Sequence, residues 1–174
     1  LWIFVATGLA AFLLGLKLAP QRAWFSFVHN HFYFLSLALG GAFFAAIQWV
    51  TGAMWSAPIR RLAESFTAYL PFTLVSFVIL SIGVHELYHW SHSEVVAADV
   101  VLQGKSSYLN AKFFMIRNLL GLGLLIWLTR KLISNSLLQD HTRDPGLTLR
   151  NRSLSPLFLI LFALGFTMMS FDTL

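Results

Sequence analysis

Five long apolar runs limit what this chain can fold into more than any other feature. They cover Leu1 to Leu16, Phe32 to Trp55, Tyr69 to Tyr88, Phe113 to Leu128 and Pro156 to Phe171. Each run approaches or exceeds the length of about 20 residues that a helix needs to cross a bilayer. Because lipid cannot satisfy open strand edges, all five spans are predicted to be helical. The sequence therefore predicts an all-α polytopic membrane protein, with residues 1–174 in a single transmembrane helical domain.

The composition agrees with this class and excludes several others. Hydrophobic residues make up 57% of the chain, charged residues 11%, and the mean hydropathy is +0.72, which is too apolar for a soluble domain. The net charge of +5 lies in short loops, so the predicted partners are lipid headgroups and not nucleic acid. The absence of cysteine excludes Cys-ligated iron–sulfur clusters and c-type haem attachment. Any metal centres for electron transfer must belong to other subunits.

The loops between the runs predict an orientation. They are Lys17 to His31, Ser56 to Ala68, Trp90 to Lys112 and Thr129 to Ser155, and an interfacial helix is expected over Ala57 to Phe66. The second and fourth loops hold more arginine and lysine, so the positive-inside rule assigns them and the N-terminal end to the cytoplasm. Because the first residue, Leu1, already lies in an apolar run, the chain is expected to be part of a longer protein.

The third run ends in a cluster of titratable residues. His85-Glu86-Leu87-Tyr88-His89 matches the zincin pattern, in which two histidines one helical turn apart bind zinc and the glutamate activates water. Spacings of four and three would place His85, His89 and His92 on one helical face. They could equally be histidines of an interfacial belt, and Glu86 could pair with Lys105 or Arg117. No metal is predicted on this chain.

The other unusual polar residues fall on the same predicted periplasmic side. His29 and His31 precede the second run, where they could simply cap the helix or lie among lipid headgroups, and Arg117 opens the fourth run. Asp172 follows the fifth run, where a carboxylate is costly unless it faces a bundle interior, a partner or water. His85, Glu86, His89 and Asp172 are therefore the main candidates for proton handling, and His29, His31, His92 and Arg117 are weaker candidates for cofactor binding.

Five stretches together carry a family resemblance: Met54 to Glu64, Tyr88 to His92, Leu102 to Asn110, Phe113 to Arg117 and Thr167 to Asp172. In these stretches and in their order, the chain resembles the NrfD/PsrC-type membrane subunits of bacterial alternative complex III. Within the complex the chain looks most like the F subunit. The resemblance implies the N-terminal half of a ten-helix protein with a four-helix bundle core, in the bacterial cytoplasmic (inner) membrane.

The resemblance also implies a function and partners. The chain would contribute to menaquinol or ubiquinol binding, to proton conduction, or to anchoring the periplasmic subunits, and quinol could bind a neighbouring subunit instead. The expected partners are the NrfD-like C subunit, the iron–sulfur B subunit, multihaem and monohaem cytochrome c subunits, and a terminal oxidase. Two alternatives from other classes are an intramembrane HExxH zinc metalloprotease, with Asp172 as third ligand, and a b-type haem anchor, with His29 or His31 facing His85 or His89.

Overall fold

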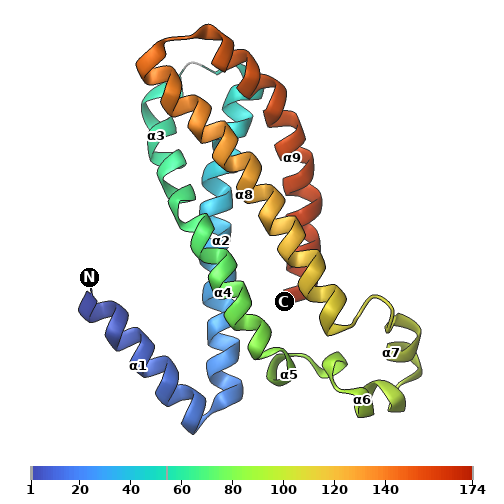
Figure 1. Cartoon of the computed structure of the whole chain (residues 1–174). Coiled ribbons are helices and arrows are strands. Elements are labelled where there is room, and N and C mark those ends of the chain that lie inside the picture. The colour runs from blue at the N-terminus through green and yellow to red at the C-terminus, as the bar shows by residue number, and fades with distance from the viewer. Residues whose placement is uncertain (1, 54, 174) are drawn as a thin grey trace. The chain divides into compact units, whose positions relative to one another are not determined.

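A computed structural model of the chain describes residues 2–53 and 55–173, so Leu1, Met54 and Leu174 lie outside the described residues. Helices occupy nearly all of this part of the chain, and it contains no strand. The elements are α1 (Trp2–Leu18), α2 (Pro20–Thr51), α3 (Ala57–Phe66), η1 (Thr67–Tyr69), α4 (Leu70–Ile82), α5 (Val84–Leu87), η2 (His89–Ser91), α6 (Ser93–Ala98), α7 (Val100–Lys105), α8 (Ala111–Thr142) and α9 (Pro145–Thr173) (Figure 1).

Four helical segments among the described residues are long and apolar enough to cross a membrane. They are Pro20–Thr51, Ala57–Ile82, Ala111–Thr142 and Pro145–Asp172. The expected class, an all-helical multi-pass membrane protein, is therefore confirmed. The first expected span corresponds to α1, an apolar helix of only 17 residues.

Two predicted loops were wrong, because the structure makes them helical. The segment from Lys17 to His31 belongs mostly to α2, which starts at Pro20 directly after a break at Ala19. Proline disfavours helical geometry at the preceding residue but suits the first turn of a helix, which explains both the break and the new start. The predicted Thr129 to Ser155 loop is a helical hairpin with a turn at residues 143 and 144.

Local sequence signals explain the ends of this hairpin. Arg143 has φ 54°, a left-handed conformation that reverses the chain after α8. Asp144 Oδ1 then accepts a hydrogen bond of 2.8 Å from the Gly146 backbone amide, and Pro145 is the first residue of α9. An acidic cap followed by proline is a typical helix start.

Contacts divide the chain into two compact units. Unit 1 comprises Leu1–Phe32 and Ser76–Met115. Its core holds Trp24, Val28, Leu80 and Leu87. A Cβ atom on Gly83 would overlap the Trp24 indole, so glycine at this position lets the ring pack directly on the backbone.

Unit 2 comprises Tyr33–Val75 and Ile116–Leu174. The α2 and α3 helices approach each other closely at Gly41. A Cβ atom at this position would overlap the Ala63 carbonyl oxygen, so the absence of a side chain allows the contact. The Phe43 ring of α2 lies 4.9 Å from the Phe162 ring of α9, measured between centroids. Asn135 of α8 donates a 2.9 Å hydrogen bond to Asn151 of α9. This hydrogen bond places Asn135 and the buried Asn151 between α8 and α9.

The α3 helix is the expected short helix at Ala57 to Phe66, with Pro58 in its first turn. Its apolar residues Ile59, Leu62 and Phe66 are exposed, whereas Glu64 is only 5% exposed. This is the reverse of the pattern in a soluble bundle. An outward apolar face with a buried carboxylate is what an apolar solvent such as lipid requires.

Candidate functional site

Asp172 is held by two side chains of α8 within unit 2. Arg117 Nε donates a 2.7 Å hydrogen bond to Asp172 Oδ2, and Asn118 Nδ2 donates a longer one of 3.3 Å to the same oxygen. The side chains of Arg117 and Asp172 are 9% and 3% exposed, so this is a buried ion pair. The α8 and α9 helices meet closely here, since a Cβ atom on Gly121 would lie 3.2 Å from the Met169 methyl carbon.

The energetics of this pair explain why it matters. Moving two charges out of water costs several kcal/mol per ion, and a good hydrogen-bonded geometry only partly offsets the cost. Charged residues at membrane depth are rare and usually belong to ion or proton pathways. The structure thus brings together two predicted candidates, Arg117 and Asp172, and adds Asn118 to them. The proposed approach of His85 or His89 to Asp172 stays a prediction, because the histidines belong to unit 1.

The His85 to His92 segment has a geometry different from the expected one. The α5 helix ends at Leu87, and Tyr88 is extended, with φ −122° and ψ 117°. His89 begins a separate 3₁₀ turn, so the three histidines do not share one helical face as predicted. The ring of Tyr88 stacks on Trp90 at a centroid distance of 5.1 Å and lies 5.5 Å from Phe114, which holds the break in place.

Two of the histidines nevertheless lie together. The His85 and His92 rings are 5.7 Å apart, and His92 Nε2 lies 2.8 Å from the His85 carbonyl oxygen, to which it donates. His85 Nδ1 also lies 3.1 Å from Ser91 Oγ. A small cavity of about 200 Å³ adjoins this cluster and is lined by Gln21, His85, Glu86, Leu87, Tyr88, His89 and His92. All four titratable residues of the predicted motif therefore face one space.

His29 and His31 lie inside α2, well after its start at Pro20, so they do not cap the helix. His29 is exposed, whereas His31 is 5% exposed. His31 Nδ1 lies 2.6 Å from Ser76 Oγ of α4, both in unit 1. This contact is a short side-chain hydrogen bond between two apolar helices.

The most extensive polar cluster of unit 2 was missed by the sequence analysis. Arg61 forms ion pairs with Glu64 and with Asp140 of α8. Ser136 Oγ donates a 2.7 Å hydrogen bond to Glu64 Oε1, and Arg61 donates to the Ser136 carbonyl oxygen at 2.8 Å. The Glu64 side chain is 4% exposed, so its charge is satisfied entirely by its neighbours. We name Arg61, Glu64, Ser136 and Asp140 the Arg61 network.

One signal could have pointed to this network. Arg61 and Glu64 are three residues apart on α3, a spacing that lets two side chains of a helix pair. The helix is also strongly amphipathic, with polar and apolar residues on different faces. Nothing in the linear pattern connects them to Ser136 and Asp140, which lie more than 70 residues later.

Among residues 2–53 and 55–173, no group of three or more His, Cys, Asp or Glu side chains is arranged to hold a metal ion. No model of a known protein family matches the chain, and no curated protein matches it.

Proposed function

We propose that this chain is a membrane subunit of a bacterial respiratory quinol-oxidising complex of the alternative complex III type. It would lie in the cytoplasmic membrane, with α1 as a fifth span. The observation that carries the proposal is the buried Arg117–Asp172 pair, in which Asp172 also accepts a hydrogen bond from the Asn118 side chain. The ordered stretches that resemble the family include both ends of this pair, at Phe113 to Arg117 and Thr167 to Asp172.

The chemistry of quinol oxidation gives these residues a role. Oxidation of a quinol to a quinone releases two electrons and two protons. The electrons would pass to iron–sulfur and haem partner subunits, because this chain has no cysteine to hold a cluster. The protons need titratable groups at membrane depth. Asp172 is such a group, and the cavity beside His85, Glu86 and His89 offers a second set.

The zincin alternative receives less support from the geometry. In that motif, two histidines on consecutive turns of one helix point at the same metal. Here the extended Tyr88 separates His85 from His89 and interrupts the helix between them. The haem alternative is neither favoured nor excluded by the contact of His31 with Ser76, because that contact uses Nδ1 and leaves Nε2 available.

The test is to replace Asp172 with asparagine in the full-length protein within its purified complex. The substitution keeps shape and hydrogen-bonding capacity but removes the titrating group, so assembly should survive. Quinol oxidation should fall by about 10²-fold or more if proton transfer there limits the rate. Subunit content is measured in parallel. The matched control is Asp140→Asn, an exposed carboxylate at the other polar cluster of unit 2, which should leave turnover unchanged.

Two results would reject the proposal in different ways. Unchanged turnover in an intact Asp172→Asn complex would mean that Asp172 has only a structural role. It would favour the interpretation that this chain is a scaffold of the complex. Purification of the full-length wild-type chain without any iron–sulfur or haem partner would remove the respiratory assignment itself.

A further inference from the structure

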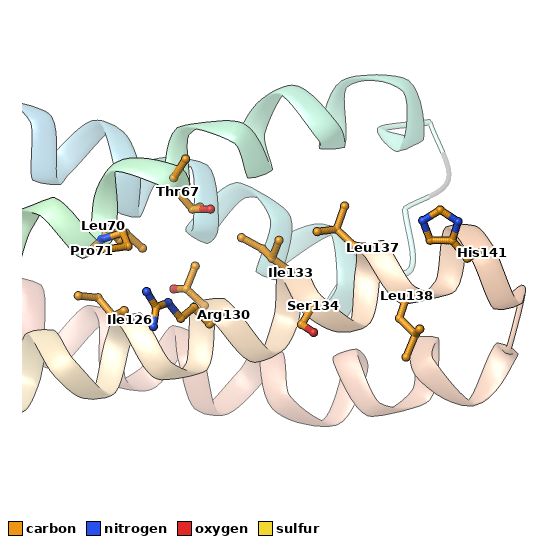
Figure 2. Close-up of a pocket in the computed structure, with 12 residues that line it drawn as sticks. Thr67, Leu70, Pro71, Ile126, Arg130, Ile133, Ser134, Leu137, Leu138 and His141 are labelled. Atoms are coloured by element: carbon orange, nitrogen blue, oxygen red, sulfur yellow. The ribbon is translucent and has the colours of Figure 1, made fainter.

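A cavity in unit 2 lies between the η1–α4 segment and the second half of α8 (Figure 2). Its volume is about 570 Å³, within the usual range for a small-molecule site. Most of the wall is apolar, with Leu70 and Pro71 on one side and Ile126 and Ile133 on the other. The cavity therefore offers a long apolar surface to a ligand.

The polar part of the wall is cationic. Arg130 is the only permanently charged residue that lines the cavity, and no acidic residue lines it. Within the described part of the chain, the side chain of Arg130 makes no hydrogen bond or ion pair. By contrast, the hydroxyls of Thr67 and Thr129 already donate to carbonyl oxygens of their own segments, at 2.6 and 2.8 Å. The guanidinium is thus the one permanently charged group that the cavity offers a ligand, beside the polar groups of Ser134 and His141, and it favours an anion.

The position of Arg130 along α8 indicates where that anion lies. Arg130 follows the apolar run that ends at Leu128, so it is expected near the level of the lipid headgroups. Figure 2 shows its side chain reaching back along α8 toward Ile126, beside Leu70 and Pro71. A guanidinium binds phosphate through parallel hydrogen bonds, and these are strong where water is scarce. A phosphate bound here would have apolar walls directly beside it.

We infer that this cavity binds an anionic phospholipid, with its phosphate on Arg130 and an acyl chain along Leu70, Pro71 and Ile126, on the side of Arg130 where the apolar run lies. A free phosphate ion would satisfy the charge but leave the apolar walls uncovered. A zwitterionic lipid would cover the walls, but its own cationic headgroup would compete with Arg130. Only an anionic amphiphile matches both parts of the site.

The test uses the full-length protein in detergent, with phosphatidylglycerol as the probe. Binding is followed by native mass spectrometry and by the rise in unfolding temperature on lipid addition. Arg130→Gln should weaken phosphatidylglycerol binding about tenfold or more, because a charge-assisted hydrogen bond is lost. The matched control is Lys131→Gln, which removes the same charge from the next residue. Lys131 is exposed, as Arg130 is, but it does not line the cavity. Lys131→Gln should change binding less than twofold.

A second variant tests whether the cavity itself is occupied, without altering charge. Ser134 lines the cavity and is exposed, so Ser134→Leu should fold normally while it fills part of the space and weakens phosphatidylglycerol binding. Inorganic phosphate and phosphatidylcholine should not raise the unfolding temperature in the wild type.

Four outcomes would overturn the inference. Equal losses in Arg130→Gln and Lys131→Gln would mean diffuse attraction to the surface, and equal stabilisation by inorganic phosphate would mean an ion site without a lipid. Equal binding of phosphatidylcholine would remove the role of charge. Loss of a partner subunit from the Arg130→Gln complex, with lipid binding unchanged, would assign the cavity to a protein partner.

Discussion

Replacing Arg61 with methionine is expected to destabilise the protein strongly, although Arg61 touches no predicted site. Methionine keeps the apolar stem but removes the guanidinium, with its charge and its hydrogen-bond donors. Arg61 is the cation that pairs with Glu64, whose side chain is 4% exposed. Without it, the Glu64 carboxylate keeps a hydrogen bond from Ser136 but has no opposite charge in the Arg61 network.

The magnitude follows from burial. Removing one partner of a buried ion pair costs about 3–5 kcal/mol, because the remaining charge stays buried without compensation. The Arg61 side chain is 34% exposed, so solvent screens part of the interaction and the lower end, about 3 kcal/mol, applies. For a protein of this size that corresponds to a loss of roughly 6–12 °C in unfolding temperature.

The network supplies its own control. Asp140 also pairs with Arg61, but its side chain is 56% exposed, so Asp140→Asn should cost less than about 1 kcal/mol. The double variant Arg61→Met with Glu64→Gln removes both charges and should recover much of the loss. Unfolding of the detergent-solubilised protein, followed by tryptophan fluorescence, measures all three. The reasoning fails if Arg61→Met and Asp140→Asn cost the same, or if the double variant is less stable than Arg61→Met.

Three further predictions address topology, packing and metal binding. Cysteines introduced at the exposed positions Thr142 and Ser106 should label from opposite sides of intact cells, with Thr142 cytoplasmic; labelling of both from one side would contradict the topology. Gly41→Ala should cost several kcal/mol because its Cβ would overlap backbone, whereas Gly40→Ala, with open space, should be neutral or stabilising by up to about 1 kcal/mol in thermal unfolding. Metal analysis of the purified chain should find zinc well below one atom per chain, and stoichiometric zinc that disappears in His89→Ala would revive the protease alternative.

The linear sequence was sufficient for the class of protein and for several helix starts. Apolar runs and scarce charges predict membrane helices, since length and hydropathy are properties of a continuous segment. Pro58 correctly predicted the start of α3, because a proline in the first helical turn acts locally. The sequence predicted helix ends wrongly where polar residues flank an apolar run, as at Lys17 to His31. Such residues can extend a membrane helix beyond the bilayer, so they do not by themselves indicate a loop.

Only the tertiary structure decided which polar residues meet. Asp172 was recognisable as a costly carboxylate, but its partner Arg117 depends on how α8 and α9 pack. Glu64 gave no warning of its burial, because that burial comes from the rotation of α3 against α8, and Ser136 is 72 positions away in the sequence. The break at Tyr88 likewise depends on its packing with Trp90 and Phe114. Spacing along the chain determines which face of a helix a residue occupies, whereas contacts between helices determine what that face meets.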